Sequence, residues 1–426
     1  MLDPRLLKED SELIKNMLKR RNLTDFPFDE LINLDQKRRK LIASVQDLRK
    51  RKNQLSDLVA QKKKAKDSVE LELSEMKLVG VSLADEENAL SSVLENFELM
   101  LLRLPNLLDD LVPDGPDEKS NVLIRKSGVP RTFAFAPKDH MSLALKLNLV
   151  DVERAGKISG ARFYFLKNGL VKLNQALINY ALDFLSESGY ELLQPPYMIR
   201  RKPMEGAVIL NDFQDVIYKI ESEDLYMIGT SEHAIASMLM DEIVDGQKLP
   251  LRFAGLSPCF RKEAGAHGKD MKGIFRVHQF EKVEQFAFCK PDQSRGEQER
   301  MLSLAEKFVQ QLGIPYRVML LSSGDTGKIS SKTYDIEAWM PGQSAYREII
   351  SCSNCLDYQA RRLSIRFRDR TNEETRLVHT LNSTLVATER MMVSIIENYQ
   401  NEDTTITVPP VLRRYMDGQS LLEHGS

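Results

Sequence analysis

Residues 260–286, FRKEAGAHGKDMKGIFRVHQFEKVEQF, contain the side chains that most directly indicate chemistry. Charged and aromatic residues lie on both sides of a glycine-containing turn, namely Arg261, Glu263, Arg276, Phe280 and Glu284. Guanidinium groups bind phosphate or carboxylate oxygens through paired hydrogen bonds, and a phenyl ring offers a flat surface for a base. Glu263 could accept a hydrogen bond from an amine, and the glycines would let the loop close over a ligand. The pattern predicts a binding site; the alternative is a salt-bridged solvent face with one aromatic ring.

The residues after this turn are expected to form a strand, 275–286. The two-residue period of a strand would place alternate side chains on one face, and these are Arg276, His278, Phe280, Lys282 and Glu284. Pairing with the strand before the turn would bring two guanidinium groups, two carboxylates and an exposed phenyl ring together.

Two further stretches carry groups that could complete such a site. In YREIISC, residues 346–352, Glu348 and Ser351 supply two oxygen ligands of the kind that hold Mg²⁺ beside phosphates. A half-buried strand with a surface glutamate gives the same pattern. Residues 379–400 begin with small polar side chains and continue into an amphipathic helix that presents Arg390, either as a phosphate contact or as a solvent-exposed arginine. The sequence has neither a GxxxxGK[ST] loop nor a strand-linked GxGxxG, so a nucleotide would be held in another way.

The region around these stretches is predicted to be an antiparallel α+β domain, because its strands pair by short hairpins and not by regular βαβ crossovers. The expected strands are YELLQPPYM after Gly189, then 251–260, 275–289, 316–321 and 346–352. The expected helices are 169–188, 231–245 and 294–312. Residues 413–426 are expected to be frayed.

The N-terminal region has a different periodicity. Leucines recur every seven residues from Leu34 to Leu55, and a second series with the same spacing runs from Met76 to Leu104. Two heptad segments separated by a polar, lysine-rich bend predict an antiparallel helical hairpin with a coiled coil at about 28–104. Arg38 and Lys52 occupy expected core positions, where long side chains can lift their charges into water.

Charge is distributed unevenly over this hairpin. Lysine and arginine dominate residues 37–66, whereas residues 70–98 are acidic. Charge pairing between the helices of a solvated coiled coil explains part of this pattern. An excess of basic side chains on one helix is also what contact with a phosphate backbone would use.

Composition sets the wider limits. The chain has 426 residues with 42% hydrophobic and 29% charged residues and a formal net charge of −2, as in ordinary globular proteins. It lacks an apolar run long enough to span a membrane, and its N-terminus fits neither a signal nor a transit peptide. A cytoplasmic location is expected. The pair Cys352 and Cys355 gives only two of the ligands that a structural zinc site needs, so no zinc is expected and the thiols are interpreted as buried.

Together these stretches resemble the seryl-tRNA synthetase family of class II aminoacyl-tRNA synthetases, along essentially the whole chain. GYELLQPPYM resembles motif 1, residues 260–286 resemble motif 2, and LNSTLVATERMMVSIIENYQ resembles motif 3. GTSEHAI, residues 229–235, is similar to the serine-binding Thr-x-Glu loop, and YREIISCSNC to the metal-ligating segment. The wording NSTLVATER is closer to archaeal and eukaryotic cytosolic members than to bacterial ones.

The resemblance implies a role for each matching position. The catalytic residues would be Arg261, on the α-phosphate and the serine carboxylate, and Arg390, on the distal phosphates of a bent ATP. The implied ATP-binding residues are Arg261, Lys262, Glu263, Arg276, Val277, His278, Gln279, Phe280, Glu348, Ser351 and Arg390. The implied serine-binding residues are Thr230, Ser231, Glu232, Arg261, Glu284, Asn382 and Thr384. Mg²⁺ would be bound by Glu348 and Ser351, and tRNA by Arg38, Arg49, Lys50, Arg51 and Lys52.

The implied activity is the ATP-dependent activation of L-serine to seryl-adenylate and transfer of the seryl group to the 3′-terminal adenosine of serine tRNA. Residues 1–111 would form the tRNA-binding arm, 112–121 a linker and 122–426 the catalytic domain. A homodimer is implied by motif 1, and no membrane is involved. Whether selenocysteine tRNA is a second substrate is left open. Thr384 stands where other members have serine, which leaves the partner of the substrate hydroxyl open between Thr384 and Asn382.

Two other functions are compatible with parts of this pattern. One is a related ligase that loads an activated amino acid onto a carrier protein, although such enzymes lack the long basic arm. The other is a catalytically silent coiled-coil scaffold or nucleic-acid-binding protein, against which the intact Arg261, Glu263, Glu348 and Arg390 argue.

Overall fold

The computed structural model describes residues 1–209, 215–263 and 273–425. The chain forms two compact units. The N-terminal unit comprises Met1–Lys19 and Leu23–Pro105, and the C-terminal unit comprises Arg20–Asn22 and Asn106–Ser426. Among the residues described, none of the helices combines the length and the apolar run that a membrane crossing requires. Most of the turn within residues 260–286, that is 264–272, lies outside the described residues.

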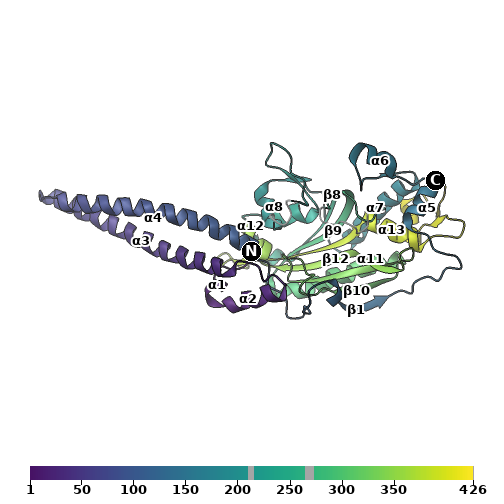
Figure 1. Ribbon diagram of the computed structural model, residues 1–426, viewed down its shortest axis with the longest axis horizontal. Coiled ribbons are helices and arrows are strands. Elements are labelled where there is room, and N and C mark those ends of the chain that lie inside the picture. The colour runs from purple at the N-terminus through teal and green to yellow at the C-terminus, as the bar shows by residue number, and fades with distance from the viewer. Residues whose placement is uncertain (210–214, 264–272, 426) are drawn as a thin grey trace. The chain divides into compact units, whose positions relative to one another are not determined.

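The N-terminal unit is dominated by two long helices, α3 (Phe28–Ala65) and α4 (Glu70–Arg103), which lie side by side (Figure 1). Two short helices, α1 (Leu6–Glu9) and α2 (Ser11–Arg20), precede them. Val45, Leu55 and Val59 of α3 are buried, as are Leu83 and Phe97 of α4. The predicted antiparallel helical hairpin is therefore confirmed.

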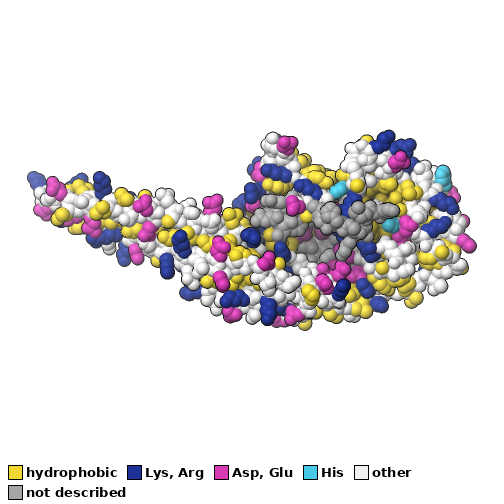
Figure 2. Space-filling model, viewed as in Figure 1, with side chains coloured by type: hydrophobic (Ala, Val, Ile, Leu, Met, Phe, Trp, Pro, Cys, Tyr) yellow, Lys and Arg dark blue, Asp and Glu magenta, His cyan; other side chains and the backbone are white. Residues whose placement is uncertain are grey.

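Charged side chains pair across this hairpin, and Figure 2 shows both signs of charge along its surface. Arg49 Nη2 lies 2.6 Å from Glu87 Oε1, and Arg51 Nη2 lies 2.5 Å from Glu75 Oε1. Arg38 is half-buried, with its guanidinium 4.7 Å from the centre of the Phe97 ring. Interhelical pairing thus accounts for part of the basic excess on α3, as the simpler interpretation expects.

The C-terminal unit is built on an eight-stranded sheet in the order β1–β10–β11–β12–β15–β9–β8–β4 (Figure 1). Neighbouring strands are antiparallel except β4 and β8, which are parallel. The strands are β1 (Val122–Ser127), β4 (Glu191–Leu193), β8 (Leu251–Phe260), β9 (Gln279–Cys289), β10 (Tyr316–Leu320), β11 (Lys332–Met340), β12 (Ala345–Leu356) and β15 (His379–Ala387). The predicted α+β class with an antiparallel sheet is confirmed.

Two hydrophobic clusters cover the sheet. One contains α5 (His140–Lys146), α7 (Gly169–Glu187), α11 (Ser294–Gln311) and α13 (Thr388–Asn398). The other contains α8 (Arg201–Ala207), α10 (Ser231–Ser237) and α12 (Tyr358–Leu363). Alternation along β9 sends Val283 and Ala287 into the first cluster and Phe286 and Phe288 into the second.

Two inner strands of the sheet, β11 and β15, are not predicted from the sequence. Both are buried along nearly their whole length. Strand β15 shows no regular polar–apolar alternation, so the two-residue period that identifies a strand is missing there. In β11 that period is present, because Tyr334, Ile336 and Ala338 alternate with polar residues, so this strand could have been predicted.

Several expected boundaries are wrong. Strand β9 begins at Gln279, so Arg276 and His278 precede it and do not continue its face. Phe280, expected to be exposed, is only 5% exposed. Helix α10 ends at Ser237, well short of residue 245. Residues 413–426 are expected from the sequence to be frayed, but β17 (Leu421–Leu422) pairs with β16 (Ile406–Thr407), so the described part of this segment, 413–425, is ordered against the rest of the unit.

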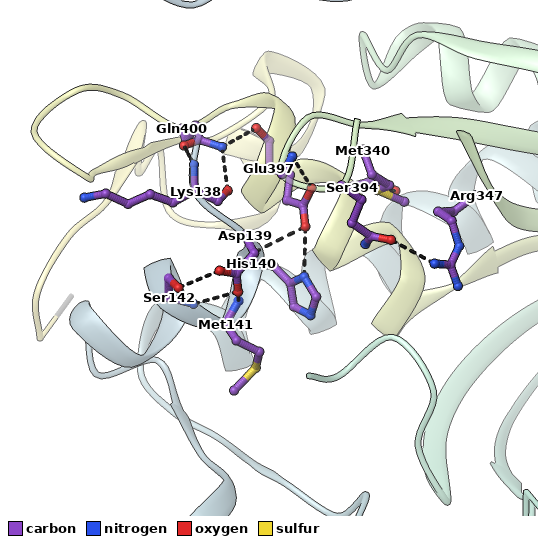
Figure 3. Close-up of polar contacts among 12 residues, drawn as sticks. Lys138, Asp139, His140, Met141, Ser142, Met340, Arg347, Ser394, Glu397 and Gln400 are labelled. Atoms are coloured by element: carbon purple, nitrogen blue, oxygen red, sulfur yellow. Dashed lines mark hydrogen bonds and ion pairs between the residues drawn. The ribbon is translucent and has the colours of Figure 1, made fainter. Parts of the chain in front are cut away.

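A polar junction fixes the C-terminal end of α13 (Figure 3). The fully buried carboxylate of Glu397 accepts a hydrogen bond from His140 Nδ1 at 2.9 Å through Oε1 and one from the Gly342 backbone N–H at 2.9 Å through Oε2. Gly342 packs closely here, since a Cβ atom would lie 2.8 Å from Asp139 Cα. The helix that presents Arg390 is thereby tied to the start of α5 and to the turn between β11 and β12.

Candidate active site

A cavity of about 220 Å³ lies in the C-terminal unit, lined by residues of β9, β12, β15, α10 and α13 and by those that follow β8. Helix α10 can approach β8 because Gly255 has no side chain. A Cβ atom there would lie 2.5 Å from Ile235 Cδ1 and 2.8 Å from Ser231 Cβ. Thr230 caps the helix, and its side-chain oxygen accepts a hydrogen bond from the Glu232 backbone N–H at 3.3 Å.

Glu284 is the most heavily hydrogen-bonded acid of this cavity. Its Oε2 accepts hydrogen bonds from the Thr230 hydroxyl, from Ser231 Oγ at 3.0 Å and from the Glu232 backbone N–H at 3.1 Å. Its Oε1 lies 2.7 Å from Lys282 Nζ. Burial opposes ionisation, but the Lys282 charge and these hydrogen bonds outweigh it and lower the pKa of Glu284 below its ordinary value.

Glu232 lies beside Glu284 and is held differently. Its Oε1 accepts hydrogen bonds from Gln359 Nε2 and Asn382 Nδ2, each at 2.9 Å. Burial, and next the negative charge of Glu284, raises the pKa of Glu232 to about 7. Its Oε2 has no hydrogen-bond donor among the residues that the structure describes. Of these two neighbouring acids, Glu284 is therefore ionised at neutral pH, whereas Glu232 changes its charge near pH 7.

Three arginine side chains also line this cavity. The Arg261 guanidinium lies 5.3 Å from the centre of the Phe280 ring, and its Nε donates a hydrogen bond to the Gly229 carbonyl at 3.1 Å. Arg276 Nη1 lies 2.7 Å from Glu263 Oε2, and Arg390 Nη1 lies 2.9 Å from Glu348 Oε1. Guanidinium groups beside an aromatic ring can bind the phosphates and the base of a nucleotide.

A second cavity of about 850 Å³ shares Arg276, Glu348, Ser351 and Arg390 with the first. Acidic side chains line part of it, and Figure 2 shows Asp and Glu gathered near the hollowed part of this face. The Arg390 charge lowers the pKa of Glu348 against the effect of burial, so this carboxylate is ionised at neutral pH.

The oxygens of Glu348 and Ser351 suit a hard cation. In the parts of the chain that are described, no group of three or more His, Cys, Asp or Glu side chains could hold a metal ion by itself. Mg²⁺ commonly takes one or two protein oxygens and completes its shell with phosphate oxygens and water. The residues present therefore fit Mg²⁺ bound together with a nucleotide. Cys352 and Cys355 are buried thiols, and burial raises the pKa of Cys352 to about 12.

Comparison with known proteins shows to which family the chain belongs. A family model for the seryl-tRNA synthetase N-terminal domain matches residues 1–108, and one for the class II tRNA synthetase core domain (G, H, P, S and T) matches residues 217–399. Serine–tRNA ligase of Nitrosopumilus maritimus is 58% identical over 98% of this chain and 99% of its own length. That of Cenarchaeum symbiosum is 54% identical over 99% of this chain and 100% of its own length. The chain belongs to the seryl-tRNA synthetase family.

Solved structures of this family have the same fold. The crystal structure of seryl-tRNA synthetase from Pyrococcus horikoshii complexed with ATP matches with a TM-score of 0.95 and 44% identity, covering 100% of both chains. Cytoplasmic serine–tRNA ligase from Naegleria fowleri in complex with AMP matches with a TM-score of 0.88 and 34% identity, covering 100% of this chain and 99% of that one. The sequence NSTLVATER in motif 3 predicts a resemblance to archaeal and eukaryotic cytosolic members, and the archaeal relatives agree with this prediction.

Most residues matched to the seryl-tRNA synthetase motifs line the smaller cavity, namely Thr230, Glu232, Arg261, Glu263, Arg276, Val277, Phe280, Glu284, Glu348, Ser351, Asn382, Thr384 and Arg390. Four others do not line it. Ser231 supports Glu284, His278 Nδ1 lies 2.7 Å from the Arg261 carbonyl oxygen, Lys262 lies over the Tyr218 ring and Gln279 is exposed. His278 precedes β9 and Gln279 is its first residue, so the predicted strand face does not extend to His278.

Some residues at this synthetase site are not assigned a role by sequence reasoning. Lys282 and Glu389 line the cavity, and Gln359 of α12 reaches Glu232. The two-residue strand period places Lys282 on one face with Phe280 and Glu284 but gives it no role. Gln359 has no such signal, because it follows the YREIISCSNC segment on a helix that is not predicted from the sequence.

Proposed function

We propose that this chain activates L-serine with ATP and transfers the seryl group to the 3′-terminal adenosine of serine tRNA, through the cavity described above. The single observation that carries the proposal is the composition of this cavity. It combines two acids of different charge state with three guanidinium groups and an aromatic ring. Full-length similarity to serine–tRNA ligases supports the same assignment.

ATP binds at the guanidinium groups. Phe280 stacks on the adenine ring, and Glu263 accepts a hydrogen bond from the edge of that ring. Arg261 binds the α-phosphate, and Arg276 and Arg390 bind the distal phosphates. Arg390 exchanges its contact with Glu348 for phosphate oxygens when ATP enters. Glu348 and Ser351 hold Mg²⁺, which supplies neutralisation of phosphate charge when it is bound.

Serine binds between the acids. Glu232 and Glu284 face its ammonium and hydroxyl groups, Arg261 orients its carboxylate, and Thr230, Asn382 and Thr384 complete the polar wall. A site that pairs a hydroxyl rejects alanine by about 10⁴-fold or more, because its own groups are left unpaired. Threonine is refused by lack of space.

The reaction needs no covalent bond to the protein. A serine carboxylate oxygen attacks the α-phosphorus, the bond to the bridging oxygen breaks and pyrophosphate leaves with that electron pair. A hydroxyl of the terminal adenosine of tRNA then attacks the seryl carbonyl, and AMP leaves. Positioning and neutralisation by the arginines carry both steps.

The wider assignments belong to the same proposal. Residues 1–111 form the tRNA-binding arm, 112–121 a linker and 122–426 the catalytic domain. The arm binds the tRNA through its shape and backbone. The protein is a cytoplasmic homodimer assembled through the motif 1 segment, and light scattering after size exclusion measures its mass directly.

Charging of serine tRNA with labelled serine tests the proposal. The folded protein is expected to form seryl-tRNA, and Arg261→Lys is expected to lower kcat/KM by about 10²-fold or more, because lysine cannot make the paired contact. Failure of the folded protein to charge serine tRNA in the presence of ATP and Mg²⁺ would contradict the proposal.

A further inference from the structure

Lys282 is a buried cation in the cavity that the proposed reaction leaves without a role. Its side chain is 6% exposed, its Nζ lies 2.7 Å from Glu284 Oε1, and the Glu284 side chain is 3% exposed. Both residues lie on β9 and line the smaller cavity. Burying two charges has a high desolvation cost, so a buried pair within a binding site calls for a functional explanation.

The charged groups around Lys282 come from β9 itself, from α10 and α13, and from the segment that follows β8. Glu284 is on β9 itself, Glu232 and His233 are on α10, Arg261 follows β8, and Glu389 is on α13. Burial, with the Arg261 charge next, lowers the pKa of His233 to about 3, so this ring is neutral. Lys282 is thus the cation of this group that lies in hydrogen-bond contact with a serine-pocket acid.

We infer that Lys282 is a positioning residue of the serine pocket, which keeps the Glu284 carboxylate charged and aimed into the cavity; this inference rests on the proposed function. The three donors on Oε2 and the ammonium on Oε1 hold the carboxylate from both sides. Oε1 has Lys282 as its one hydrogen-bond donor among the described residues, so it retains a lone pair for the substrate.

This arrangement has a consequence for charge. Lys282 balances Glu284, and Glu232 is then the acid whose ionisation complements the ammonium group of serine. The pKa of Glu232 is raised to about 7, so serine binding strengthens as pH rises through about 7. Because the Lys282 charge lowers the pKa of both acids, its removal raises both values and moves the onset of serine binding to higher pH.

The test is the pH profile of serine-dependent ATP–pyrophosphate exchange, from about pH 5.5 to about pH 9. At neutral pH Lys282→Met is expected to raise the KM for serine by about 10- to 100-fold, to leave the KM for ATP within about 3-fold and to shift the serine profile to higher pH. Lys282→Arg retains the charge and is expected to keep the midpoint of the wild-type profile. Lys290→Met is the matched control, because Lys290 pairs with Asp369 outside the cavity and its loss is expected to leave the profile unchanged.

A double-mutant cycle separates positioning from direct contact. If Lys282 acts through Glu284, Lys282→Met adds less than about 3-fold to the serine KM in an E284Q background. An equal loss in both backgrounds, a loss confined to ATP or kcat, or a displaced midpoint in K282R would overturn the inference. Thermal melts of each variant show whether a loss of activity comes from unfolding. If Lys282→Met does not fold, the test is the midpoint of the pH profile of K282R. Absence of serine-dependent exchange by the wild-type protein would instead overturn the proposed function, and the inference with it.

Discussion

At the scale of single residues, burial and hydrogen-bond partners give chemically identical side chains different charges. Glu284 and Glu232 are adjacent, yet the pKa of Glu284 is lowered and that of Glu232 is raised to about 7. Lys282 and two hydroxyl groups stabilise the first carboxylate, whereas the amides of Gln359 and Asn382 provide weaker compensation for the second. A pocket for a zwitterion needs both an ionised acid and an acid that can ionise when a cation enters.

Glu389 predicts a pH dependence of stability. It is 2% exposed, and burial, opposed by Arg390, raises its pKa from 4.5 to about 7. The stability that its proton contributes is present below about pH 4.5 and is lost as pH rises through about 7. Glu389→Gln is therefore expected to match the wild-type protein near pH 5 and to exceed its free energy of unfolding near pH 8 by up to about 3 kcal/mol.

Chemical denaturation of the ligand-free protein at several pH values measures this difference. The pKa of Glu232 is also raised, so the stability of the Glu389→Gln variant still falls as pH rises, but by less than that of the wild-type protein. Parallel curves for the variant and the wild-type protein would contradict the prediction.

At the scale of residues, the sequence predicts which side chains line the cavity better than it predicts their burial and their charge. Arg261, Glu263, Phe280 and Glu284 line the cavity together, as their spacing suggests. The burial of Phe280 was not predictable, because the elements that cover it come from distant parts of the chain. The ionisation of Glu232 depends on the same long-range packing.

At the scale of elements, the site depends on how closely secondary structures approach each other. Helix α10 delivers Thr230 and Glu232 only because it lies directly against β8. Helix α13 delivers Arg390, and the junction around Glu397 holds its far end. Neither contact is visible in sequence periodicity.

Gly255→Ala tests the first contact. The new Cβ would lie 2.5 Å from Ile235 Cδ1 and 2.8 Å from Ser231 Cβ, so α10 must move and carry Thr230 and Glu232 with it. The KM for serine in pyrophosphate exchange is expected to rise by about 10-fold or more, with the KM for ATP nearly unchanged. Gly156→Ala is the control, since its Cβ meets no atom within 4 Å and alanine favours the helix. A serine KM that is unchanged in Gly255→Ala would refute this view of α10.

Glu397→Ala tests the second contact. It leaves the His140 ring and the Gly342 N–H without their buried acceptor (Figure 3) and is expected to lower the free energy of unfolding by about 3 kcal/mol or more. Denaturant titration measures the change. Glu402→Ala, at an exposed acid beyond α13, is expected to change it by less than about 0.5 kcal/mol. Equal stability of the two variants would show that the junction contributes little.

At the scale of the whole molecule, the two units divide the chemistry and the proposed recognition of tRNA. Heptads are long and repeated, so the helical hairpin is predictable almost to its ends. The class of the sheet is predictable from its hairpins, but strand β15 is not, because it is buried on both faces and has no regular periodicity. Strand β11 keeps a two-residue alternation that could have predicted it. The smaller cavity is lined by residues of α10, α13 and strands β9, β12 and β15, most of which lie far apart in the sequence, so only folding brings these residues together.

The arm predicts a separation of activities. Arg49 and Arg51 pair with Glu87 and Glu75, whereas Lys50 and Lys52 are exposed. Replacing Lys50 and Lys52 with alanine is expected to weaken tRNA charging and to reduce its salt dependence by a slope of about 1 for each phosphate that is no longer neutralised. Adenylate formation is expected to be unaffected. Lys248→Ala, at an exposed lysine of the C-terminal unit, is the control, and equal loss of both activities in the arm variant would contradict this division.

Amino-acid-dependent exchange of pyrophosphate into ATP, without tRNA, tests most directly whether this cavity activates serine. Serine, threonine, alanine, glycine and cysteine would be compared with folded protein and Mg²⁺. Exchange with serine alone is the predicted result, because alanine, glycine and cysteine lack the hydroxyl group that the site pairs and the pocket has no space for the additional methyl group of threonine. Exchange with another small amino acid in place of serine, or with none of them, would contradict the assignment.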